Sequence, residues 1–115
     1  GYQSLMKDLK QSTKQRFGGM DFNYPDTEIE TEIVTHEGHV DKAIAEKLVQ
    51  VAQRSRNLKG HGLDEGMSTR LLVYAAQLMA KGIDAQSACE MALVTPLTDD
   101  PDMRDTLGAA VNTYF

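Results

Sequence analysis

The sequence predicts a mainly α fold, a small helical bundle preceded by one helix and one short strand. Apolar residues recur at helical spacing along most of the chain, whereas a strand-like alternation occurs only over residues 20–24. A single strand cannot satisfy its backbone hydrogen-bonding groups without a neighbour. We therefore expect this strand to belong to a sheet in another domain, with a boundary between residues 1–24 and residues 25–115.

The N-terminal part is expected to contribute a helix and this strand. Apolar residues recur at helical spacing within residues 4–17, and Gly18 and Gly19 end the helix. Pro25 ends the strand. The chain begins at Gly1 without an initiator Met, so we expect it to be cut from a longer protein.

Residues 25–115 are expected to be helical throughout. Thr27 and Glu30 have the spacing of a capping box at the start of the first of these helices. The apolar stripe of that helix is expected to be Ile29, Ile33 and Val34. After a break at Gly38, a second stripe steps by about one helical turn. It consists of Val40, Ile44, Leu48, Val51 and Ala52.

Side-chain caps predict where the remaining helices start. Residues 57–67 contain three glycines and form a loop, after which Ser68 caps a helix that Gly82 ends. Asp84 opens a short helix, and Asp100 followed by a proline opens the last one. The expected apolar faces of these three helices are Leu71, Leu72, Ala75, Leu78 and Met79; Ala88, Met91 and Ala92; and Met103, Leu107, Ala110, Val111 and Tyr114.

Charge is distributed unevenly along the chain. The net charge of −5 combines a balance of +2 in residues 1–24 with −7 in residues 25–115, which hold eight basic and fifteen acidic residues. A duplex-binding surface needs a basic face along the whole domain, so we expect no nucleic-acid partner. Four of the eight cations fall within seventeen positions and favour a local pocket for a small anion, although a solvated charged face is the alternative. These four are Arg54, Arg56, Lys59 and Arg70.

The chain lacks the sequence features of a membrane or secreted protein. No apolar run approaches the roughly 20 residues that a membrane span needs, and no signal-peptide pattern opens the chain. The single cysteine, Cys89, cannot form an internal disulfide, and its apolar neighbours indicate a small core residue. We therefore expect a cytoplasmic location and no membrane partner.

The sequence contains no complete catalytic or metal site. The glycines of residues 60–66 have the spacing GxGxxxG, which departs from the dinucleotide fingerprint, and the P-loop pattern is absent from the chain. His36 and His39 are three positions apart, but Gly38 lies between them and no carboxylate–histidine pattern completes a metal site. A metal-dependent hydrolase is therefore disfavoured, and no metal ligand is predicted.

Two arginines are candidates for contact with an anion. Arg70 lies in the first turn of its helix, beside free backbone N–H groups and the positive end of the helix dipole. An anion held between the helix start and the guanidinium would be stabilised there; a solvated or ion-paired arginine is the alternative. Arg16 closes the first helix, which by itself is the ordinary place for a cation.

Several segments together resemble one family, the CbbQ/NirQ/NorQ family, which belongs to the MoxR group of AAA+ ATPases. The resemblance spans nearly the whole chain and is most specific over residues 56–75. The segments that carry it are Gly1-Tyr2-Gln3-Ser4, Lys7-Asp8-Leu9-Lys10, Ser12-Thr13, Gln15-Arg16-Phe17, Asp21-Phe22, Tyr24-Pro25, residues 56–66, residues 68–75 and Pro96-Leu97-Thr98-Asp99-Asp100.

The resemblance implies a hexameric ring ATPase built from an α/β core and a helical lid. Residues 1–24 would be the last helix and strand of the truncated core, and residues 25–115 would be the lid. Arg16 would be the arginine finger, which acts in trans on the ATP of a neighbouring subunit. Arg70 would be the sensor-2 arginine, which contacts the phosphates of ATP bound by its own subunit.

The cofactors that the resemblance implies are ATP and magnesium in the complete protein, with none bound by this chain alone. The Walker motifs would lie upstream of Gly1, so we expect the chain alone to be folded but inactive toward ATP. Three positions depart from the pattern. The glycines at 18 and 19 replace an apolar pair, and Lys14 stands where many relatives have arginine.

The partners that the resemblance implies are the neighbouring subunits of a homo-hexameric ring, a protein with a von Willebrand factor A domain, and a target metabolic enzyme. Members of the family activate or mature enzymes such as Rubisco and nitric oxide reductase. The competing hypothesis from the residues alone is a free-standing helical interaction adaptor without a nucleotide role. A P-loop motif within about two hundred residues upstream would favour the ATPase.

Overall fold

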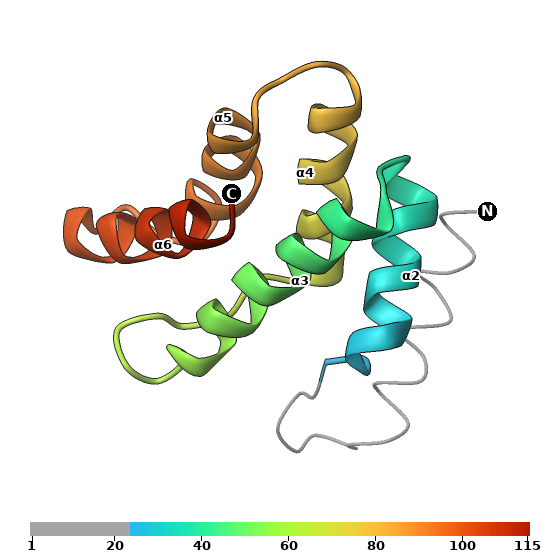
Figure 1. Ribbon diagram of the computed structural model, residues 1–115. Helices are drawn as coiled ribbons and strands as arrows, with labels where there is room; N and C mark the ends of the chain where they lie inside the picture. Colours follow the sequence, from blue (N-terminus) through green and yellow to red (C-terminus); the bar gives the residue numbers. More distant parts are fainter. Residues whose placement is uncertain (1–23) are drawn as a thin grey trace.

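The computed structural model describes residues 24–115, and within them it is mainly helical, as predicted, with no β-strand (Figure 1). The helix predicted over residues 4–17 lies outside this range. So does the predicted strand except for Tyr24, which belongs to neither a helix nor a strand. The elements are α2 (Thr27–Gly38), α3 (Lys42–Asn57), α4 (Thr69–Ala80), α5 (Ala85–Cys89), the π-helix η1 (Glu90–Val94) and α6 (Pro101–Tyr114).

Helix α3 lies across the middle of the molecule and contacts α2, α4 and α6 (Figure 1). Helix α4 also packs against α2, α5 and η1, so the helices enclose one apolar core. The approach of α2 to α4 is close, since a Cβ added to Gly38 would lie 2.3 Å from the Cβ of Ala76. Among the fully buried side chains are Leu48, Leu72, Leu93 and Leu107. No helix within residues 24–115 combines the length and apolarity needed to cross a bilayer.

The three predicted helix caps are confirmed. Ser68 accepts a hydrogen bond from the backbone N–H of Leu71 at 3.3 Å, and Asp84 and Asp100 each cap the helix that follows them. The hydrogen bond donated by the backbone N–H of Ser87 holds the pKa of the Asp84 carboxyl below its ordinary value. Each side chain satisfies one of the backbone donors left free at a helix start.

The predicted capping box at the start of α2 is wrong. Asp26, not Thr27, is the N-cap residue, and Glu30 is fully buried instead of bonding back to the helix start. The buried face of α2 is centred on Glu30 and Val34, which are one turn apart, so Ile29 lies at its edge and is 49% exposed. Ile29 therefore does not belong to the apolar stripe predicted for this helix.

Met91, predicted on the apolar face of the short helix, is also exposed. Its neighbours Ala88 and Ala92 are buried as predicted. The buried face here consists of Ala88, Cys89, Ala92 and Leu93, at positions i, i+1, i+4 and i+5, so Met91 points away from the core. The segment ends in a π-turn, in which the backbone N–H of Thr95 donates to the carbonyl of Glu90 at 3.0 Å.

Candidate functional site

Arg70 is the second residue of α4 and its side chain is exposed. No hydrogen bond or ion pair joins its guanidinium to another residue within 24–115. The first N–H groups of a helix have no partner inside the helix, and they carry the positive end of its dipole. The start of α4 therefore combines free backbone donors with an uncommitted guanidinium, a combination that favours an anion with several acceptor oxygens.

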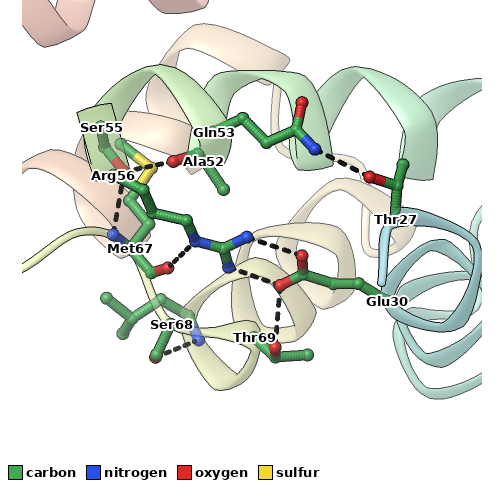
Figure 2. Close-up of polar contacts among 10 residues, drawn as sticks. Thr27, Glu30, Ala52, Gln53, Ser55, Arg56, Met67, Ser68 and Thr69 are labelled. Carbon is green, nitrogen blue, oxygen red and sulfur yellow. Dashed lines mark hydrogen bonds and ion pairs between the residues drawn. The ribbon is translucent and has the colours of Figure 1, made fainter. Parts of the chain in front are cut away.

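The start of α4 is held to the rest of the bundle by Arg56, near the end of α3. Its Nη1 and Nη2 donate to the two carboxylate oxygens of Glu30 at 2.7 and 2.5 Å, and its Nε donates to the carbonyl of Met67 at 3.0 Å (Figure 2). The side chains of Arg56 and Glu30 are 10% and 1% exposed. A two-pronged ion pair of this kind fixes geometry as well as charge.

Two further side chains complete this arrangement. Thr69, the first residue of α4, donates its hydroxyl to Oε2 of Glu30 at 2.8 Å (Figure 2). The Ser55 hydroxyl accepts from the backbone N–H of Met67 at 2.9 Å and donates to the carbonyl of Ala52. Both backbone polar atoms of Met67 are therefore bound by α3, three residues before Arg70.

The loop between α3 and α4 approaches α3 so closely that only glycine fits at position 66. A Cβ added to Gly66 would lie 2.6 Å from Cγ and 2.8 Å from Cα of Arg56. Arg56 also contacts Tyr24, because its guanidinium carbon lies 3.8 Å from the centroid of the Tyr24 ring. Arg56 thus contacts the segment before α2, α2 itself and the loop before α4.

Two of the four cations that favour a basic pocket are engaged with other residues. Arg56 points into the bundle toward Glu30, and the Arg54 guanidinium packs on the Tyr114 ring, 5.7 Å from its centroid. Lys59 and Arg70 are exposed. Of these four cations, Arg70 is the one that lies at a helix start, and its guanidinium has no partner among residues 24–115.

Arg16 lies outside the described residues, so its role stays a prediction. Sequence reasoning missed Glu30 and Thr69, which hold the start of α4. One signal for Glu30 was available, because it precedes the buried Ile33 and Val34 by three and four positions and therefore shares their face. An acidic residue on an apolar face needs a buried partner.

Comparisons with known proteins match this chain to one family. The family model described as "CbbQ/NirQ/NorQ C-terminal" matches residues 30–114. Protein CbbQ of Hydrogenophilus thermoluteolus is 68% identical over 115 residues, covering 100% of this chain and 43% of the relative. Protein NorQ of Paracoccus denitrificans is 46% identical over 104 residues, covering 90% of this chain and 38% of the relative.

A third relative has a descriptive name. The denitrification regulatory protein NirQ of Pseudomonas aeruginosa is 46% identical over 101 residues, covering 88% of this chain and 39% of the relative. The chain thus spans about two fifths of the length of the curated relatives it matches.

Proposed function

The chain belongs to the CbbQ/NirQ/NorQ family, and we propose that it is the lid and adjoining core edge of a ring-forming AAA+ ATPase of the MoxR group. In this proposal residues 25–115 form the lid, and residues 1–24 are the last helix and strand of the α/β core. The observation that carries the nucleotide role is Arg70, an exposed cation at a helix start with no partner among residues 24–115.

Arg70 is proposed to be the sensor-2 residue, which binds the phosphates of ATP in its own subunit. Phosphate oxygens are multiple, anionic acceptors, and they match both the guanidinium fork and the free N–H groups at the start of α4. Magnesium bound with ATP would neutralise part of the phosphate charge. No P-loop occurs in these 115 residues, so the complete protein would supply that part of the site.

Arg16 is proposed to act across a subunit interface. As an arginine finger in a homo-hexameric ring, it would stabilise charge that develops on the phosphates bound by the neighbouring subunit. The lid would then couple the nucleotide state of one subunit to the geometry of the ring.

The proposed partners follow from the family. We propose that the complete protein activates or matures a metabolic enzyme of the Rubisco or nitric oxide reductase type, together with a protein that carries a von Willebrand factor A domain. The name of the NirQ relative, a denitrification regulatory protein, supports the second enzyme class.

An interaction adaptor without a nucleotide role is the second candidate. An open groove of about 670 Å³ beside α2 and α3 favours it. The exposed Ile29 lines this groove together with three glutamates, which outnumber its one lysine and suit an apolar segment that carries basic residues. The charged lining residues are Glu28, Glu32, Glu46 and Lys42. In the adaptor hypothesis Arg70 has no role in binding a nucleotide.

Substitution of Arg70 separates the two candidates. In the complete protein, Arg70→Ala should weaken ATP binding about tenfold to a hundredfold, since a hydrogen-bonded charge contributes about 1.5–3 kcal/mol. Arg70→Lys should restore only part of the affinity, because the planar two-pronged contact is lost. Titration with a fluorescent ATP analogue and steady-state hydrolysis measure both effects.

Lys81→Ala is the matched control, because Lys81 is an exposed cation at the opposite end of the same helix. It should leave ATP affinity and hydrolysis unchanged. If Arg70→Ala behaved like Lys81→Ala, the sensor role would be wrong and the adaptor would be favoured.

A further inference from the structure

A row of buried polar side chains ends one residue before Arg70. Arg56 binds both oxygens of Glu30, and Glu30 accepts the hydroxyl hydrogen bond of Thr69. Glu30 is fully buried and Thr69 is 4% exposed. We call these three residues the Glu30 cluster. A protein is strongly destabilised when a buried carboxylate loses a partner. The positions of the three side chains in this cluster are therefore fixed relative to one another.

The bond from Thr69 fixes the rotation of the first turn of α4. Successive side chains of a helix point about 100° apart, so a Thr69 turned inward leaves Arg70 turned outward. Met67 is already held at its backbone N–H by Ser55 and at its carbonyl by Arg56. The backbone that leads into Arg70 is therefore held at both residues 67 and 69.

We propose that Glu30, held by Arg56 and bonded to Thr69, is a positioning residue for Arg70. It acts through Thr69, and neither of them touches the nucleotide. The cluster sets the direction in which the Arg70 side chain leaves the helix, and so keeps the guanidinium ready for phosphate before the nucleotide arrives. This inference rests on the proposed sensor role of Arg70 and adds the residues that prepare it.

Thr69→Val tests the cluster with the smallest change. It replaces one hydroxyl by a methyl group of similar size and leaves Glu30 paired with Arg56. Thr69→Ser keeps the hydroxyl and is the rescue variant. Thr106→Val is the matched control, because Thr106 is an exposed threonine on α6 whose hydroxyl bonds only to the carbonyl of Asp102, at 3.0 Å.

The measurement is a double-mutant cycle on ATP-analogue affinity in the complete protein. Thr69→Val should weaken binding about twofold to tenfold, the equivalent of one hydrogen bond of about 0.5–1.5 kcal/mol. Thr69→Ser and Thr106→Val should bind like the unmodified protein. In the Arg70→Ala background, Thr69→Val should have no further effect, because there is no guanidinium left to position.

Thermal unfolding of the same variants separates positioning from general stability. A merely structural role for Thr69 would lower the melting temperature and weaken binding by the same factor with or without Arg70. Additive effects, or no effect of Thr69→Val while Arg70→Ala weakens binding, would overturn this inference and leave the sensor role standing. If Arg70→Ala had no effect, both would fall. Should Thr69→Val not fold, Thr69→Ala serves the same cycle.

Discussion

Cys89 illustrates how burial controls the chemistry of a single residue. It is fully buried at the end of α5, and burial raises the pKa of its thiol from the ordinary value of 9.0 to about 12. The thiolate is the nucleophile, so the folded protein should hold an inert thiol. Alkylation by iodoacetamide at pH 8 should be at least tenfold slower in buffer than in denaturing urea.

The same shift makes stability depend on pH in a defined direction. Well below pH 9 the Cys89 thiol is neutral in the folded and the unfolded protein, so it does not reduce the free energy of unfolding. Above pH 9 the unfolded thiol ionises first, and the unfolding free energy falls by at most about 1.4 kcal/mol per pH unit until the folded thiol titrates. A Cys89→Ala variant should show a shallower loss of unfolding free energy between pH 9 and 11; equal slopes would contradict the buried-thiol account.

Arg70 and Glu30 differ in how far the sequence could reveal them. The position of Arg70 at a helix start is predictable from the sequence, because the N-cap residue Ser68 lies two positions before it and the helix has a clear apolar face. The partners of Glu30 lie 26 and 39 positions further along the chain. A capping box was the local explanation for Thr27 and Glu30, and only the packing of α2 against α3 and α4 shows otherwise.

At the scale of elements, the loop between α3 and α4 has an open position at Gly60 and a fixed half around Gly66. Gly60 adopts φ +84°, and a Cβ added there would meet nothing within 4 Å. Position 66 requires glycine for a different reason, because a Cβ there would collide with the side chain and the backbone of Arg56. At Gly60 only the backbone conformation favours glycine, whereas at Gly66 the space itself is filled by Arg56.

Paired alanine substitutions test this division. Gly60→Ala should cost about 1 kcal/mol of unfolding free energy, the strain of a left-handed conformation at a residue with a Cβ. Gly66→Ala should cost about 1–3 kcal/mol from overpacking and should shift Arg56 away from Glu30. Urea unfolding followed by circular dichroism gives both values.

A second measurement makes the contrast stricter. In the complete protein, Gly66→Ala should also weaken ATP binding, because it disturbs the Glu30 cluster, whereas Gly60→Ala should not. An equal effect of the two variants on nucleotide affinity would show that the whole loop, and not its fixed half, supports the start of α4.

Three of the helix starts are predictable from the sequence, whereas the start of α2 and the exposure of two apolar residues are not. Ser68, Asp84 and Asp100 cap by hydrogen bonds to residues three positions ahead, so the signal is local. Ile29 and Met91 were placed on apolar faces because their spacing is helical, but both are exposed. In both helices the exposure depends on which face the helix turns to its neighbours, and that is fixed by tertiary packing.

At the scale of the whole molecule, the proposed function requires residues from more than one subunit. Arg70 belongs to residues 25–115, the proposed lid, while Arg16 belongs to residues 1–24, the proposed edge of the core. A finger at the edge of the core is expected to reach the ATP of the neighbouring subunit. In the complete protein, Arg16→Ala should therefore allow ATP binding and ring assembly but reduce hydrolysis by about a thousandfold or more.

Mixed rings test whether Arg16 acts in trans. One subunit carries Arg16→Ala, and the other lacks the lysine of the expected upstream P-loop, so rings of either kind alone should be inactive. In a mixed ring, the first subunit offers an intact nucleotide site and the second an intact finger, and some interfaces become complete. Hydrolysis should then reappear when the two proteins exchange subunits, with native mass spectrometry confirming that mixed rings form. Inactive mixed rings would argue against action in trans. Near-normal hydrolysis by Arg16→Ala alone would identify Arg16 as an ordinary cation at a helix end.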